Sequence, residues 1–191
     1  MKSPAHQAQV EIDAPVVDWP SDFPTVDAMQ LLAERALGAL ADLDQLIVAD
    51  AQGRVPTFGV TLVILDDARM AEINFEQRGK DQPTDVLSFP AFDFPPGPGT
   101  SELANASDEL FEILNAWPVP GDAPLYHVGD IVISYETCVR QAAEIGHGVI
   151  DEFQRLLVHG LLHLFGYDHE TSAADETRMR AREDLLLEAL D

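Results

Sequence analysis

Three histidines near the carboxyl end of the sequence have the spacing of a metal site. His159 and His163 lie four residues apart, and His169 follows six residues later. If the apolar pattern around them forms a helix, the first two imidazoles share one face of it, with Cβ atoms about 6 Å apart. Gly166 can adopt the left-handed conformation that ends a helix, so the chain can turn back and bring in His169. Three imidazoles and an open fourth position are typical of catalytic zinc, so we predict one Zn²⁺ per chain, although other divalent transition metals also suit this ligand set.

The same spacing matches the metzincin protease pattern H-E-x-x-H-x-x-G-x-x-H with one departure. Gly160 stands where those proteases carry their general-base glutamate. Without that carboxylate, a peptidase lacks the group that takes a proton from the attacking water. The pattern therefore supports a metal site and disfavours peptide hydrolysis. It leaves open which group, if any, replaces the missing base.

The elements that would position this triad follow from the periodicity of apolar residues. Alternating or β-branched runs predict four strands, and apolar residues at three-to-four spacing predict five helices in the main part of the chain. The expected strands are 8–14, 59–65, 86–89 and 129–134, and the expected helices are 27–41, 67–74, 135–146, 150–165 and 173–190. Ser172 begins a capping box for the last helix. This order predicts an α+β fold, with a single mixed sheet of about four strands packed with about five helices.

Length and composition indicate one domain. The chain has 191 residues, 46% of them hydrophobic, which is enough for a buried core. We expect a single domain over 1–191 with a Pro-rich surface insertion at about 92–124, in which 107–115 has the pattern of a short helix. No apolar run reaches the roughly 20 residues of a membrane span, and the first residues do not resemble a secretory signal, so we expect a cytoplasmic protein. Cys138 is the only cysteine, which excludes an internal disulfide.

The charge of the chain limits its partners. Eleven Lys and Arg residues stand against 34 Asp and Glu residues, which gives a net charge of −23. Such a field repels nucleic acids and anionic lipids, so broad binding to phosphates is disfavoured. Arg78 and Lys80 lie just before a segment, 81–136, that contains no Lys or Arg. Any contact with phosphate would therefore be focal.

Several motifs together resemble one protein family. They are H-G-L-L-H-L-F-G-Y-D-H at 159–169, R-G-K-D at 78–81, P-T-D-V-L-S-F-P at 83–90 and G-D-I-V-I-S at 129–134. These motifs, in this order, resemble the YbeY family of bacterial endoribonucleases, which are also called rRNA maturation factors. The resemblance spans roughly residues 8–190 and is interrupted by the Pro-rich insertion.

The resemblance implies a zinc-dependent, single-strand-specific endoribonuclease that acts in 16S rRNA 3′-end maturation and ribosome quality control. It implies that the three histidines are the zinc ligands and that Arg78 is the catalytic basic residue. A guanidinium offers a planar fork of donors that suits phosphate oxygens, which agrees with this role. Lys80 and Asp85 are candidate substrate-binding residues. Asp168 either orients a ligand histidine through the ring nitrogen that does not bind the metal, or ends the turn.

The acidic balance adds an expectation about delivery of the substrate. Because the chain repels free RNA, we expect the ribosome or a ribosomal protein to present the rRNA. Two alternatives remain open at this point. One is a zinc peptidase or another metal-dependent hydrolase that uses the same triad, which requires a compensating carboxylate near the metal. The other is a non-catalytic ribosome-assembly factor with a structural metal, which requires a fourth protein ligand.

Overall fold

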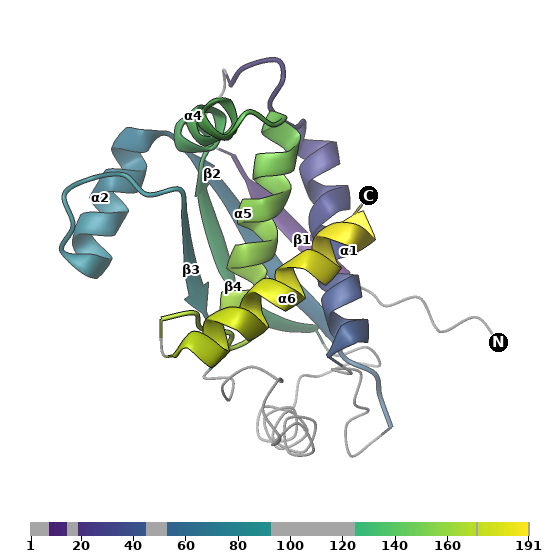
Figure 1. The fold of residues 1–191 in the computed structure, drawn as a ribbon. Coiled ribbons are helices and arrows are strands. Elements are labelled where there is room, and N and C mark those ends of the chain that lie inside the picture. The colour runs from purple at the N-terminus through teal and green to yellow at the C-terminus, as the bar shows by residue number, and fades with distance from the viewer. Residues whose placement is uncertain (1–7, 15–18, 45–52, 93–124, 171, 191) are drawn as a thin grey trace.

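The fold is built on one four-stranded sheet (Figure 1). The structure is a computed structural model and describes residues 8–14, 19–44, 53–92, 125–170 and 172–190. The strands lie in the order β1 (Ala8–Asp13), β2 (Thr57–Leu65), β4 (Leu125–Ser134) and β3 (Val86–Pro90). Neighbours β1, β2 and β4 run parallel, while β3 is antiparallel to β4. The predicted single mixed sheet is confirmed.

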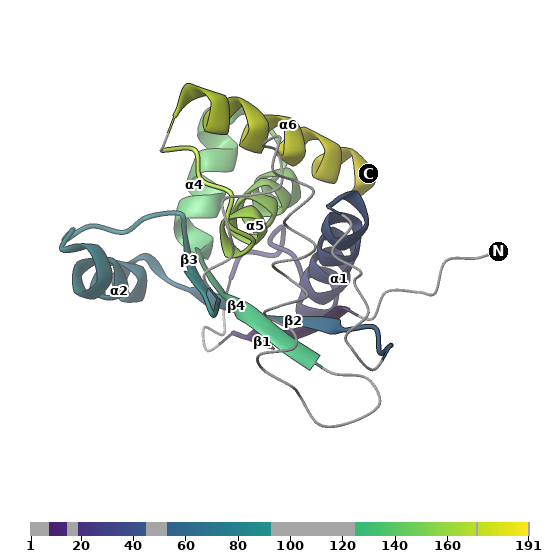
Figure 2. The ribbon, with the colours of Figure 1, turned by 90° about the horizontal axis from the view of Figure 1, so that it is seen from below.

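Five helices accompany the sheet in the described part of the chain. They are α1 (Val26–Leu43), α2 (Asp67–Arg78), α4 (Tyr135–Ile145), α5 (Val149–Leu164) and α6 (Ala173–Leu190). Figure 2 shows α1, α5 and α6 on one side of the sheet, with α2 set apart beyond β3. The predicted helix 107–115, and all but the first residue of the predicted insertion, lie outside the described residues.

Alternation along the strands divides the apolar side chains between two cores. Leu62 and Ile64 of β2 and Ile131 of β4 belong to a large core that α1, α5 and α6 cover. Leu65 of β2 and Val132 of β4 point the other way and pack in a smaller core with α2. Successive side chains of a strand face opposite sides of the sheet, so this central pair of strands is buried on both faces. Helix α5, which covers the large core, packs against both β4 and β3.

Capping groups set the ends of the helices that carry the site. The Asp66 side chain accepts a hydrogen bond from the Arg69 backbone N–H at 2.8 Å and begins α2, while Gly79, with φ of 67°, ends it. Arg78 is therefore the last residue of α2, next to the loop that leads to β3. The hydroxyl of Ser172 accepts from the backbone N–H three residues later at 3.1 Å, which confirms the predicted cap of α6.

The single cysteine is buried, and its thiol contacts the backbone carbonyl of Val149 at 3.9 Å. Cys138 lies in α4, within the large core, and it is a free thiol. Burial, and then the charge of Glu152, raise the pKa of Cys138 to about 12. The thiol therefore stays protonated at neutral pH and acts as a small apolar side chain. None of the helices in the described ranges is long and apolar enough to cross a membrane.

Candidate metal centre

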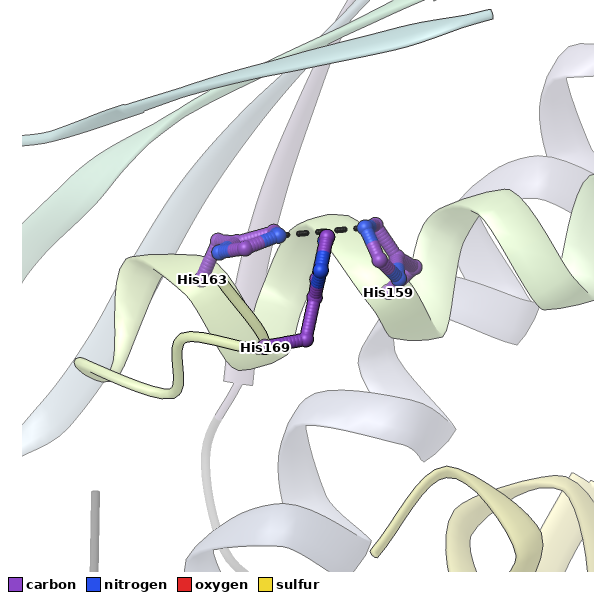
Figure 3. Close-up of side chains that lie close together, drawn as sticks. All are labelled: His159, His163 and His169. Atoms are coloured by element: carbon purple, nitrogen blue, oxygen red, sulfur yellow. Dashed lines mark hydrogen bonds between the residues drawn. The ribbon is translucent and has the colours of Figure 1, made fainter. Parts of the chain in front are cut away.

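The three histidines converge on one point, as their spacing predicts. His159 and His163 project from the same face of α5, and His169 reaches the pair from the loop that follows the helix (Figure 3). The Nε2 atoms of His159 and His163 lie 3.0 Å apart. One ring nitrogen from each of the three residues lies within 4.8 Å of the others. The three rings point toward one another and not in different directions into solvent.

This spacing fits a divalent metal ion. Bonds of about 2.0–2.1 Å in a tetrahedral site place two ligand nitrogens about 3.3 Å apart, close to the observed separation. Burial, and then the neighbouring rings of His159 and His169, lower the pKa of His163 to about 4, against smaller opposing effects of Asp168 and the Tyr167 backbone. His163 is therefore neutral at physiological pH, and the neutral imidazole is the form that binds a metal. The site can therefore hold zinc or another divalent transition-metal ion that imidazoles bind.

A short turn after α5 returns His169 to the helix. Gly166 has φ of 81°, the left-handed conformation expected for it. Its N–H donates to the carbonyl of His163 at 3.2 Å, and the N–H of Tyr167 donates to the carbonyl of Leu162 at 3.0 Å. The reversal is thus closed by two backbone hydrogen bonds, which place His169 two residues beyond the turn.

The triad opens into a pocket of about 610 Å³. All three histidines line it, together with the other predicted site residues Arg78, Lys80, Asp85 and Asp168. Arg78 and Lys80 are exposed, and neither forms an ion pair with any carboxylate in the described ranges. These two cations share the pocket with the triad and with the carboxylates of Asp85, Asp168 and Glu170. Arg78 and Lys80 therefore offer a local contact for an anionic group in a protein whose net charge is −23.

The carboxylate of Asp85 is held in place by hydrogen bonds. Its Oδ1 accepts from the Val86 backbone N–H at 2.9 Å and from the Thr84 hydroxyl at 3.1 Å, and its Oδ2 accepts from Gln141 at 3.2 Å. Burial raises the pKa of Asp85, but these donors outweigh it and hold the pKa below its usual value. Asp85 is therefore an ionised wall residue that ties the loop before β3 to α4.

Asp168 adopts one of the two roles left open by the sequence. Its Oδ1 accepts a hydrogen bond from the Glu170 backbone N–H at 2.8 Å, which shapes the turn that carries His169. The carboxylate that contacts a triad ring is Glu183, whose Oε1 lies 2.7 Å from Nδ1 of His159. Glu183 comes from α6, and no local sequence pattern indicates this partner.

A second set of residues missed in the sequence adjoins the pocket. Glu152 of α5 is fully buried, and both of its oxygens lie 3.1 Å from Nε of Arg155. His147 contacts the same carboxylate at 2.7 Å. Arg155 lines the pocket, and its guanidinium is 3.9 Å from Asp85. The three-residue spacing of Glu152 and Arg155 on a helix is the signal that points to this pair.

Close packing explains why glycine occupies position 160. A Cβ atom there would lie 2.8 Å from Cγ2 of Ile131 and 3.3 Å from the hydroxyl oxygen of Ser88. The first distance is shorter than side-chain carbons tolerate, because α5 rests directly on β4 and β3 at this point. A glutamate at this position, as in the metzincin pattern, would have to displace the side chains of Ile131 and Ser88. The departure from the protease pattern is therefore built into the packing.

Comparison with known proteins agrees with the motifs. Residues 28–191 match the family described as Endoribonuclease YbeY. Proteins named Endoribonuclease YbeY from Roseiflexus castenholzii and Leptospira biflexa are 40% and 45% identical, over 96% and 68% of this chain and 94% and 68% of theirs. A solution structure of TM1509 from Thermotoga maritima aligns with a TM-score of 0.49 at 18% identity, over 96% of this chain and 89% of that one. On the strength of the family match and the 40% and 45% identities to the named relatives, the chain belongs to the endoribonuclease YbeY family.

Proposed function

We propose that this protein is a zinc-dependent, single-strand-specific endoribonuclease of the cytoplasm that acts in 16S rRNA 3′-end maturation and ribosome quality control. Membership of the family supports the cleavage of RNA. The observation that carries the proposal is the pocket itself. It brings a triad whose ligand atoms lie within 4.8 Å of one another together with the unpaired cations Arg78 and Lys80.

The histidines and the cations of the pocket have different roles in the proposed reaction. His159, His163 and His169 would hold the ion, which when bound supplies a Lewis acid that polarises a phosphoryl oxygen and acidifies water. Arg78 binds phosphate oxygens through its guanidinium and stabilises the charge that develops on them during cleavage. Lys80 lies two residues beyond Arg78, in the loop that follows α2, and binds a neighbouring phosphate as a point charge.

Asp85 contacts the substrate in a different way. An ionised carboxylate only accepts hydrogen bonds and repels phosphate. We therefore assign any RNA contact of Asp85 to a sugar hydroxyl or a base amino group. Its fixed position between the loop and α4 suits such a directional contact. Asp168 shapes the turn that presents His169.

The charge of the protein supports delivery of the substrate by a larger assembly. A net charge of −23 opposes the approach of free RNA, while the focal positive charge at Arg78 and Lys80 accepts a strand that is already in place. The ribosome or a ribosomal protein would hold the rRNA close enough to overcome this repulsion. Weak, strongly salt-dependent binding of short RNA by the purified protein is expected.

Two features weigh against the alternatives. Peptide hydrolysis through a metzincin-like base is opposed by the packing at Gly160, where a side chain has no room. A purely structural zinc takes four protein ligands, and the group found in the described ranges comprises three histidines.

A paired assay tests the proposal. Single-stranded RNA and casein are incubated separately with the Zn²⁺-loaded wild type, Arg78→Ala and His163→Ala. RNA cleavage by the wild type that is lost in both variants supports the endoribonuclease. Casein cleavage without RNA cleavage would instead identify a peptidase. The absence of both activities, with a metal content unaffected by His163→Ala, would refute the proposal.

A further inference from the structure

We propose that Glu183 of α6 is a positioning residue for the metal centre, which fixes the ring of His159 so that its Nε2 faces the ion. The inference rests on the proposed metal site and deepens it. It assigns to α6 a part in metal binding that acts through His159, although none of the three ligands belongs to that helix.

The contact determines which nitrogen of His159 is free. Nδ1 of His159 lies 2.7 Å from Oε1 of Glu183, and Nε2 of the same ring lies 3.0 Å from Nε2 of His163. An ionised carboxylate cannot donate, so Nδ1 carries the proton and Nε2 keeps its lone pair. That lone pair points to the place where the three rings converge (Figure 3). Both side chains are only 23% exposed, so water competes weakly for the hydrogen bond.

A buried polar network holds α6 at the height that this contact needs. Arg182, the residue before Glu183, forms an ion pair with Asp44 at 2.9 Å. Tyr167 donates its hydroxyl hydrogen to the same carboxylate at 2.8 Å and accepts from Nε of Arg182 at 3.2 Å. The network joins α6 to the end of α1 and to the loop that carries His169. The backbone of Glu183 is therefore held in a fixed position by the contacts of α6 with the rest of the fold.

Carboxylates that bond the outer nitrogen of a ligand histidine orient the ring and increase its basicity, and their loss typically weakens metal binding about 10- to 100-fold. Of the carboxylates in the part of the chain that the structure describes, Glu183 is the one with a hydrogen bond to a triad ring. Asp168, which adjoins His169, bonds to a backbone N–H instead. The neighbouring Asp184 is exposed and carries the same charge without the contact. It therefore serves as a matched control.

Metal binding is measured by titrating the metal-free protein with Zn²⁺ in competition with a chromophoric chelator. Glu183→Ala is expected to weaken Zn²⁺ binding about 10- to 100-fold. Glu183→Gln, which keeps an acceptor oxygen but loses the charge, is expected to recover part of that loss. Asp184→Asn removes the same charge from the next position and is expected to bind like the wild type. Circular dichroism verifies that each variant is folded.

A second measurement reads the ring directly. The ¹⁵N chemical shifts of the histidine rings in the metal-free protein report which nitrogen bears the proton. His159 is expected to be protonated at Nδ1 in the wild type and to become a mixture of tautomers in Glu183→Ala. An Nε2-protonated His159 in the wild type would refute the inference.

The outcomes separate the inference from the proposed function. If the wild type binds Zn²⁺ and Glu183→Ala binds it equally well, Glu183 has no positioning role and the metal site stands. If Asp184→Asn weakens binding as much as Glu183→Ala does, the effect is one of general charge and the inference is also wrong. If the wild type binds no Zn²⁺, the metal site fails and the inference falls with it.

Discussion

The hydroxyl of Ser88 donates a hydrogen bond to the backbone carbonyl of Gly160 at 3.1 Å. This contact joins β3 to α5 one residue after the first histidine of the triad. The helix approaches the sheet so closely here that a Cβ atom at position 160 would collide with Ile131. Helix α5 is therefore held against both β3, through Ser88, and β4, through Ile131, and this packing leaves little room for a side chain at position 160.

The close approach predicts the effect of adding one methyl group. Gly160→Ala should lower the free energy of unfolding by about 1–3 kcal/mol, because the new Cβ overpacks the contact with Ile131. Gly38→Ala is the control, since position 38 lies within α1 and a Cβ there meets nothing within 4 Å. That change should stabilise the protein by up to about 1 kcal/mol through helix propensity. Urea unfolding measures both. A Gly160→Ala variant as stable as the wild type would contradict this packing.

Loss of the cation at the end of α2 should affect cleavage and not folding. Arg78 is exposed and lines the pocket, so Arg78→Ala should reduce the rate of RNA cleavage about 10²- to 10³-fold while the unfolding midpoint stays constant. Arg69→Ala removes the same charge from an exposed position at the other end of the helix and should cleave like the wild type. Equal losses in the two variants would show that only the overall charge matters.

Removal of the metal should destabilise the fold without abolishing it. An ion that binds only the native state, at about 1,000 times its dissociation constant, adds roughly 4 kcal/mol to the free energy of unfolding. Zn²⁺ should therefore raise the melting temperature of the chelator-treated wild type, and His163→Ala should lose this shift. His127→Ala is the matched control, because that imidazole is exposed and contacts Asp130 outside the triad. A Zn²⁺-dependent shift that persists in His163→Ala would argue against the triad as the binding site.

Asp67 should make stability depend on acidity. Its carboxylate accepts from Ser134, from Thr137 at 2.6 Å and from Arg140 at 3.0 Å, and so joins α2 to the start of α4. Burial raises the pKa of Asp67, but these donors outweigh it and hold the pKa below its usual value near 4.

The contribution of Asp67 is therefore complete above about pH 4 and is lost as the pH falls through the lower pKa of the folded state. Asp67→Asn should cost about 2 kcal/mol at pH 7, and the difference from the wild type should shrink in acid. Urea unfolding at pH 7 and in acid below about pH 4 measures the difference in the free energy of unfolding. The control is Asp22→Asn, at an exposed position. A deficit that is the same at both pH values would contradict this origin.

Local rules were sufficient to predict the triad. The four-residue spacing of His159 and His163 and the left-handed Gly166 depend only on neighbouring residues, and both occur in the structure. The order of the elements could also be predicted, because the change between strand and helix periodicity is visible within short windows. Helix α2 continues four residues beyond its predicted end at residue 74, to Arg78, and ends at Gly79. Arg78 and Lys80 flank this end of the helix and line the same pocket.

Contacts between distant elements could not be predicted in the same way. Strand β4 begins at Leu125, four residues before the predicted start, because its first residues pair with Thr57–Gly59 of β2. The alternation of apolar Tyr126 and Val128 with His127 is a short strand signal in the sequence, and both apolar residues are buried in the structure. The contact of Glu183 with His159 depends on the height at which α6 crosses α5, which periodicity does not determine.

The hydrogen bond from the Tyr167 hydroxyl to the Asp44 carboxylate joins residues that are 123 positions apart in the sequence. Tyr167 stands two residues before the last ligand of the triad, and Asp44 ends the first helix of the chain. Early and late parts of the polypeptide therefore meet beside the turn that presents His169. The complete tertiary structure supports this turn in addition to the turn's own backbone hydrogen bonds, so the third imidazole is held from two sides.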